Sequence, residues 1–282
     1  MAEPAYQLEP SEAAQILLER RRAREHLLPF TQYTKPDFEA ARHHSVICGA
    51  LEEFEQDVAA KRSPRLLIEA PPRHTKSELG TRRFPAWALG RHPAWQIIST
   101  AYSADLASDF GRDVRDIVAS QEYARLFETR LRQDSAAVNR WQTNGGGVYV
   151  ATGVGGPITG RGAHVGIVDD PLKNWQDANS ETIKESQWNW YTSTFYTRLM
   201  PGGGILLILT RWAEDDIAGR AIATEDFRRV RLQAIDEQGR ALWPAWYGPE
   251  ALAKIKSVTP PRQWEALYQQ NPTPEEGLFF NR

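Results

Sequence analysis

Short apolar runs alternate with longer amphipathic stretches through the middle of the chain. The apolar runs are short and rich in β-branched residues, and they occupy 65–70, 95–100, 148–152, 164–170 and 204–210. Helical periodicity is found at about 77–90, 103–119, 176–199 and 213–224. Strands that alternate with helices predict an α/β fold with a largely parallel sheet flanked by helices on both faces. Ligands of such sheets bind beyond the carboxyl ends of the strands, so the residues just after each run are candidate site residues.

Helices are predicted on both sides of this alternating region. Residues 11–28 and 37–60 have helical patterns, and the second has an apolar face. After residue 225 the segment FRRVRLQAI suggests one more strand, followed by short helices at 249–256 and 261–270. The pattern therefore predicts three parts: an N-terminal helical segment (1–60), a core (61–225) and a C-terminal subdomain or linker (226–282).

Composition narrows the function classes. With 34 Lys and Arg against 36 Asp and Glu, the net charge is −2, so any contact with DNA must be a local basic patch. The single cysteine, Cys48, excludes an internal disulfide and a cysteine-based zinc cluster. No run approaches the roughly 18 apolar residues that suggest a membrane span, so no membrane association is expected. A reducing cytoplasm fits these features.

The segment after the first apolar run resembles a phosphate-binding loop. Residues 70–77, APPRHTKS, match the spacing of G-x4-G-K-[ST] between a strand and a helix, but Ala70 and Thr75 replace both glycines. Backbone N–H groups at a helix start can bind phosphate oxygens, Lys76 can neutralise their charge and Ser77 can hold Mg²⁺. If position 75 needs a positive φ, a threonine is costly there. The alternative is an ordinary strand–loop–helix junction with an incidental Lys-Ser pair.

An acid pair follows the fourth apolar run. In HVGIVDDP, Asp169 is a candidate Mg²⁺ ligand and Asp170 a candidate general base for the attacking water. The alternative is that both acids cap a turn before Pro171. The two segments support each other, because both fall at strand ends in the order expected of a nucleotide-hydrolysing site.

Two further segments carry candidate residues. Thr210 ends the run GILLILT and could sense a γ-phosphate, or it could cap the next helix. The acids at 214–216 fit the first turn of that helix, where its dipole favours them, so they are interpreted as structural. Glycines surround Arg161 in the stretch 153–162, which leaves it free to reach a phosphate in a neighbouring subunit. The alternative for Arg161 is a solvated side chain on an ordinary mobile loop.

These segments together resemble the large subunit of tailed-phage terminases. APPRHTKSE is similar to the family's Walker A segment, TGVGGPITGRGAHVGIVDDP to its glycine loop and Walker B segment, and LILTRWAEDD to its coupling motif. YQQNPTPEEGLFF is similar to the end of its ATPase domain, and the resemblance covers about residues 30–282. The departure is Thr75, where the family usually has glycine, which puts the affinity for ATP in question.

The resemblance implies a P-loop NTPase core of the RecA-like, additional-strand type. It implies that ATP and Mg²⁺ are used to drive double-stranded DNA into a procapsid, in a homo-oligomeric ring, commonly a pentamer, on the portal protein. The isolated chain could be a monomer. The small terminase subunit is a further implied partner. The implied location is the host cytoplasm, transiently at the procapsid portal and not in the mature virion.

The resemblance also assigns residues by position. The loop residues Pro71, Pro72, Arg73, His74 and Thr75 would surround the nucleotide together with Lys76 and Ser77. Asp169 and Asp170 would form the acid pair, and Thr210 would couple hydrolysis to motion. Arg161 matches a loop proposed to supply an arginine finger in trans, and Arg73 is a rival finger in cis. The family's adenine pocket lies upstream of its Walker A segment, where Tyr33 and His44 are candidates, with plain packing as the alternative.

The family's nuclease domain should lie beyond residue 282, so this chain is expected to hydrolyse ATP and not to cut DNA. Two other interpretations stay open. A helicase or other nucleic-acid motor could use the same core, although it would carry a second core domain that the sequence does not show. An assembly protein with a weakened nucleotide site would explain Ala70 and Thr75.

Overall fold

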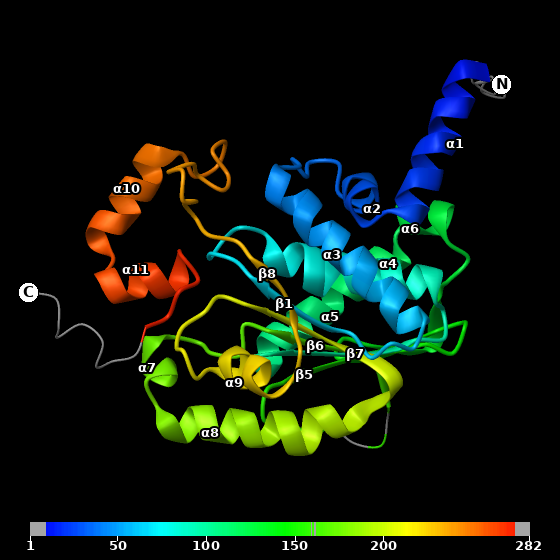
Figure 1. Ribbon diagram of the computed structural model, residues 1–282. Coiled ribbons are helices and arrows are strands. Elements are labelled where there is room, and N and C mark those ends of the chain that lie inside the picture. Colours follow the sequence, from blue (N-terminus) through cyan, green and yellow to red (C-terminus); the bar gives the residue numbers. More distant parts are fainter. Residues whose placement is uncertain (1–9, 159, 161, 274–282) are drawn as a thin grey trace, which may run out of the picture.

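A single eight-stranded sheet forms the centre of the protein in the computed structural model, which describes residues 10–158, 160 and 162–273 (Figure 1). The strand order is β3-β4-β5-β2-β6-β7-β1-β8. Neighbours from β5 to β8 pair in parallel, while β3, β4 and β5 pair antiparallel. The strands are β1 (Arg65–Glu69), β2 (Gln96–Ala101), β3 (Leu131–Ala137), β4 (Arg140–Thr143), β5 (Val148–Gly153), β6 (Ala163–Asp169), β7 (Leu199–Leu209) and β8 (Arg228–Arg231).

The mostly parallel α/β sheet predicted from the sequence is confirmed. The five apolar runs are β1, β2, β5, β6 and β7, and the weaker segment after residue 225 contains β8. The hairpin of β3 and β4 was not predicted. Its strands lie at the sheet edge and carry the polar sequences LRQDSAA and RWQT, which lack an apolar run.

Helices cover both faces of the sheet (Figure 1). One face carries α3 (Arg42–Ala59), the π-helix η1 (Glu78–Arg83), α4 (Phe84–Arg91) and α5 (Ala104–Ala119), with α1 (Pro10–Glu25), α2 (Leu27–Thr34) and α6 (Gln121–Leu126) packed outside them. The other face carries α8 (Glu181–Trp190), the π-helix η2 (Tyr191–Phe195), the 3₁₀ helix η3 (Tyr196–Arg198) and α9 (Ile217–Thr224), with α7 (Trp175–Ala178) preceding them. Because both faces are buried, the central strands are apolar at nearly every position.

Several predicted helix boundaries are wrong, and capping residues explain two of the differences. The helix expected over 11–28 is two helices that meet between Glu25 and Leu27, and the one expected from residue 37 begins at Arg42. The helix expected over 176–199 is interrupted, because Ser180 caps a new helix by accepting the N–H of Ile183. The helix expected from residue 213 begins at Ile217, because its N-terminal cap is Asp216.

The residues after β8 form a small unit of their own. It contains α10 (Pro249–Val258) and α11 (Pro261–Leu267), which lie beyond the β8 edge of the sheet (Figure 1). Its buried centre is Ala234, Leu252 and Trp264, separate from the two clusters that flank the sheet. Strand β8 itself pairs with β1, so the C-terminal unit is joined directly to the strand that precedes the candidate phosphate loop, residues 70–77.

Candidate functional site

The loops that follow β1, β6 and β7 line one cavity of about 770 Å³ at the carboxyl edge of the sheet. Seven predicted residues are on its wall: Arg73, Lys76, Ser77, Asp170 and Thr210, together with Pro72 and Thr75. They come from three strand ends that are up to 140 positions apart in the chain but adjacent in the sheet. The strand-end rule applied to the sequence therefore locates this cavity correctly.

Lys76 is the centre of the polar contacts in this cavity. Its ammonium lies 2.9 Å from Asp170 Oδ2 and donates to Thr210 Oγ1 at 2.8 Å, and its side chain is 6% exposed. The backbone N–H of Thr210 donates to Asp170 Oδ1 at 2.7 Å, and the hydroxyl of Thr210 donates to the carbonyl of Ala70 at 3.2 Å. One buried cation thus holds the ends of β1, β6 and β7 together.

Asp169, which precedes Asp170 in the chain, is buried. Its carboxylate accepts hydrogen bonds from the hydroxyls of Ser77, at 3.0 Å, and of Thr81, at 2.5 Å. Burial, helped by the charge of Asp170, raises the pKa of Asp169 to about 7, and the charge of Lys76 opposes that rise. A buried carboxylate contacted by two neutral hydroxyls favours a bound cation, because a cation would offset the cost of its charge.

The backbone of the candidate phosphate loop takes the conformation that the missing glycine would suit. Arg73 and Thr75 have φ of 63° and 59°, a region that is costly for a β-branched residue. Thr75 is held there by its hydroxyl, which donates to the carbonyl of His74 at 2.7 Å and lies 2.7 Å from His44 Nε2. Since His44 Nδ1 accepts the N–H of Ala41, we assign the ring proton to Nε2, which donates to Thr75.

The remaining predicted residues lie in different places. Pro72 and Thr75 line the cavity, whereas Pro71 and His74 are buried beside it. The structure does not place the two adenine candidates on the described cavity wall: Tyr33 packs against the main hydrophobic cluster and His44 is fully buried behind Thr75. Arg161 lies outside the described residues, so its position stays a prediction.

Sequence reasoning missed several residues of the site. Thr81 contacts Asp169 from η1. Arg82 lines the cavity, paired with Asp113 at 2.5 Å. Trp246 and Tyr247 reach the cavity from the C-terminal unit. The helical spacing after Lys76 could have indicated Thr81 and Arg82, whereas no sequence signal places residues 246 and 247 here.

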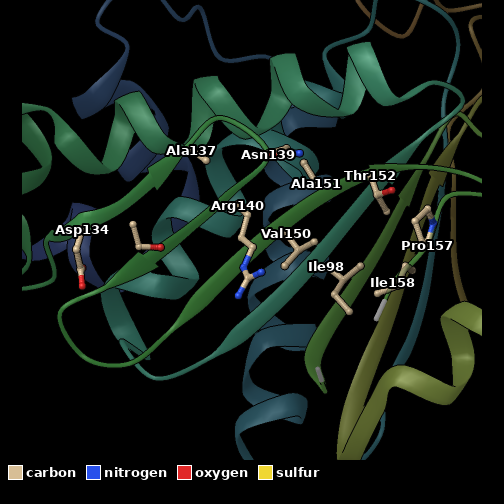
Figure 2. A pocket seen from close by; sticks show the side chains of 11 residues that line it. Ile98, Asp134, Ala137, Asn139, Arg140, Val150, Ala151, Thr152, Pro157 and Ile158 are labelled. Atoms are coloured by element: carbon tan, nitrogen blue, oxygen red, sulfur yellow. The ribbon is translucent and has the colours of Figure 1, made fainter. Parts of the chain in front are cut away.

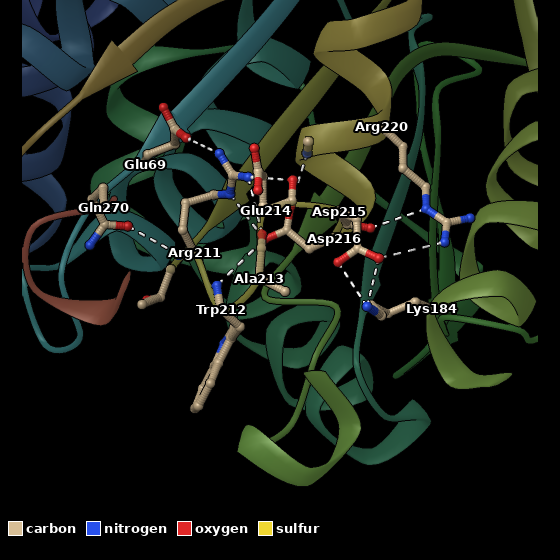
Figure 3. A network of polar contacts seen from close by, with 12 residues as sticks. Glu69, Lys184, Arg211, Trp212, Ala213, Glu214, Asp215, Asp216, Arg220 and Gln270 are labelled. Carbon is tan, nitrogen blue, oxygen red and sulfur yellow. Dashed lines mark hydrogen bonds and ion pairs between the residues drawn. The ribbon is translucent and has the colours of Figure 1, made fainter. Parts of the chain in front are cut away.

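Arg211, next to Thr210, occupies a buried polar network (Figure 3). Its guanidinium pairs with Glu69 at 2.8 Å and with Asp216 at 2.9 Å, while its backbone N–H donates to Gln270 Oε1 at 3.1 Å. Asp215 pairs with Lys184 at 2.6 Å. The interpretation of the acids as structural agrees with these contacts for residues 215 and 216. In the described part of the chain no group of three or more His, Cys, Asp or Glu is arranged to hold a metal ion.

A second hollow, of about 670 Å³, lies on the sheet surface near β2, β4 and β5 (Figure 2). Ile98, Val150 and Arg140 are among the side chains around it, and none of the predicted site residues belongs to its lining. The predicted site residues are therefore concentrated at the carboxyl-edge cavity.

Across the described residues, no helix combines the length and the apolar character needed to cross a membrane.

The fold and site geometry define a class, and comparisons with known proteins define a family. A mostly parallel sheet with a strand–loop–helix junction facing an acid pair is the arrangement of P-loop folds. A family model for the N-terminal region of the T4likevirus-type terminase large subunit matches residues 67–282, and the chain belongs to this family.

A solved structure, the crystal structure of the HK97 bacteriophage large terminase, has a similar fold, with a TM-score of 0.51 and 14% sequence identity. The match covers 83% of this chain and 51% of the HK97 chain, so this chain spans about half the length of that protein. The similarity supports the P-loop fold assignment. A search of curated proteins gave no match.

Proposed function

We propose that this chain is the ATP-hydrolysing motor domain of a terminase large subunit, which drives double-stranded DNA into a procapsid. The observation that carries the proposal is the convergence of Lys76, Asp170 and Thr210 within 3 Å contacts around one cavity, with Ser77 and Asp169 adjoining them. Family membership supports the same function.

Ser77 and Asp169 are the residues that would hold Mg²⁺. Their oxygens are already 3.0 Å apart, and the buried Asp169 forms no ion pair with any of the described residues. Mg²⁺ bound there would supply charge neutralisation for the phosphate oxygens during transfer. The fit therefore rests on the donor set, a hydroxyl and a carboxylate, which are oxygen ligands of the kind Mg²⁺ prefers.

Lys76 and Asp170 have complementary roles in this proposal. A triphosphate in the cavity would compete with Asp170 for the Lys76 ammonium, because phosphate oxygens carry more negative charge. Release from Lys76 would leave the Asp170 carboxylate free to accept a proton from the attacking water. Thr210 contacts both groups, so this change of partners would alter the hydrogen bonds of Thr210. The change would then reach β7 and the segment after it.

The direct test is Mg²⁺-dependent ATP hydrolysis by the chain and by Lys76→Ala. We expect the variant to lose on the order of 100-fold or more in turnover, since it removes the charge that faces the phosphates. Lys254→Ala, an exposed lysine on α10, is the matched control and should retain full activity. Wild-type turnover in Lys76→Ala would contradict the proposed function.

The source of the arginine finger separates two versions of the proposal. If Arg161 acts in trans, turnover should rise with chain concentration, and mixing Arg161→Ala with Asp170→Ala chains should restore part of it. If Arg73 acts in cis, mixing should restore nothing. Arg73 is exposed on the cavity wall, so it is free to contact a phosphate there.

The proposed partners follow from the function. They are double-stranded DNA, the portal protein and procapsid, the small terminase subunit and copies of this chain in a ring, in the host cytoplasm. A second candidate, an assembly protein with a weakened nucleotide site, is favoured by the positive φ of Thr75. Failure of the chain to bind ATP analogues at millimolar concentration would favour this second function over the motor.

A further inference from the structure

Trp246 is a large aromatic side chain left open at the rim of the site cavity. It lines the cavity and is 63% exposed. One ring face is covered by Trp243, whose ring lies 5.2 Å away at an interplanar angle of 20°. Stacking on Trp243 fixes the orientation of Trp246, and its exposed surface stays available to a planar ligand group.

Trp243, Trp246 and Tyr247 form an aromatic wall that packs against the phosphate loop. Trp243 is buried, with ring centroids 5.2 Å from His43 and 4.9 Å from His44. Tyr247, next to Trp246 on the cavity wall, stacks on His74 of the phosphate loop at 5.0 Å. The wall therefore keeps a fixed position relative to the residues that would bind the phosphates.

The direction of a bound nucleotide places its base near this wall. The terminal phosphate must lie near Asp170, which follows β6, and a triphosphate is an extended chain, so the nucleoside lies at the opposite end. In the sheet, β6 and β8 are on opposite sides of the β7–β1 pair, and the segment carrying Trp246 follows β8. The base is thus directed toward the C-terminal unit.

Other aromatic side chains fit this role less well. Tyr102 follows β2, which lies on the far side of β6 from β1. Phe110 also lines the cavity, but the Arg82 guanidinium lies 4.6 Å from its ring centroid. The upstream residues Tyr33 and His44 pack into the core as described above.

We propose that Trp246, seated on Trp243, stacks on the base of the bound nucleotide, so that the C-terminal unit supplies the base subsite. This inference rests on the proposed function, because it extends the same cavity. A stack uses the π-face that every base has, so the subsite selects a nucleoside triphosphate over inorganic triphosphate more than one base over another.

The experiment compares the affinities of ATP and inorganic triphosphate, each with Mg²⁺, by calorimetry on the full chain. In Trp246→Ala the Kd for ATP should rise about tenfold, while the Kd for triphosphate stays unchanged. Trp246→Phe keeps a ring and should retain most of the ATP affinity. Tyr102→Ala tests the rival wall of the cavity and should keep the ATP preference. Lys254→Ala, at an exposed position of α10, is the matched control and should change neither Kd.

The possible outcomes distinguish the base subsite from the proposed function. Unchanged ATP affinity in Trp246→Ala, or an equal loss for both ligands, overturns the base subsite. Loss of the ATP preference in Tyr102→Ala instead moves the base to the other wall and also overturns it. Both of these leave the proposed function intact if Lys76→Ala abolishes binding of both ligands. A wild-type chain that binds neither ligand contradicts the proposed function and the subsite together.

Discussion

At residue 75 a threonine stands where a glycine would avoid backbone strain. Its positive φ is expensive for threonine, yet the hydroxyl contacts His44 and the His74 carbonyl. A glycine would relieve the backbone strain but would leave the His44 Nε2–H without this acceptor, a loss of order 1 kcal/mol or more. The threonine is therefore compatible with an ordered phosphate loop.

Two substitutions at position 75 should have different effects on stability. Thr75→Val keeps the branched shape but buries an unsatisfied His44 N–H, so the free energy of unfolding should fall by about 1–3 kcal/mol. Thr75→Ser keeps the hydroxyl and removes the β-branch, so its stability should equal or exceed that of the wild type. Urea unfolding measures both, and equal stabilities for Val and Ser would contradict the role of the hydroxyl.

The buried histidines predict a loss of stability in acid. Burial and the neighbouring histidine rings lower the pKa of His43 to about 3 and that of His44 to about 4. In the unfolded chain both protonate near pH 6.5. The unfolded state therefore binds more protons below pH 6.5, and stability should fall as the pH drops from about 6.5 toward 4.

His43→Leu isolates one of these contributions. Neither ring nitrogen of His43 forms a hydrogen bond of normal geometry within the described residues, so the variant should cost little at pH 7. Its advantage over the wild type should grow as the pH falls from 6.5 to 4, by on the order of 2–3 kcal/mol. Unfolding curves that keep a constant offset across this range would show that His43 does not titrate on unfolding.

The sequence predicts well which candidate residues come together where spacing within one segment defines them. Lys76, Ser77 and the acid pair follow from local patterns at strand ends, and the structure brings them together. Trp246 could not be predicted, because its position depends on how the C-terminal unit packs against α3 and the phosphate loop. Such packing is long-range and leaves no periodic signal.

At the scale of elements, the π-helix η1 explains how Thr81 reaches Asp169. It follows the phosphate loop directly and spans Glu78–Arg83. The wider turn of a π-helix changes which side chains face the sheet, and single π-helical turns next to α-helices are frequent at functional sites. Periodicity predicted a helix here but not its π geometry, because the π stretch is only 6 residues long.

The position of Thr81 predicts an effect on the metal requirement. Thr81→Val removes one of the two hydroxyl donors to Asp169, so the carboxylate should protonate more readily and bind Mg²⁺ less tightly. The Mg²⁺ concentration for half-maximal ATP hydrolysis should rise about tenfold. Thr81→Ser should restore the wild-type value, whereas an unchanged Mg²⁺ curve in Thr81→Val would exclude this positioning role.

At the scale of the whole molecule, Arg211 joins the core to the C-terminal unit. Its guanidinium satisfies two buried acids, and its backbone N–H donates to Gln270, which is itself buried with φ of 53° (Figure 3). A change at Thr210 therefore has a direct covalent and hydrogen-bonded route to α11. The fold class was predictable from the sequence, but this junction was not, since it joins residues 59 positions apart through a side-chain amide.

Two adjacent glutamines allow this junction to be tested. Gln270→Ala removes the acceptor for the Arg211 N–H, while Gln269→Ala removes contacts to Ile235 that lie inside the C-terminal unit. In hydrogen–deuterium exchange, Gln270→Ala should speed exchange in peptides covering 210–216, because that amide loses its buried partner. Gln269→Ala should speed exchange around residue 235 and leave 210–216 protected.

The difference between the two variants shows whether the Arg211–Gln270 contact has a role of its own. If both loosened the same peptides, the C-terminal unit would be responding as one body to any damage, and the Arg211–Gln270 contact would have no separate role. If only Gln270→Ala exposes 210–216, the contact is the point at which the core holds the unit. Because Trp246 belongs to that unit, Gln270→Ala should then also weaken ATP binding while leaving triphosphate binding unchanged, since the aromatic wall would lose its fixed position relative to the phosphate loop.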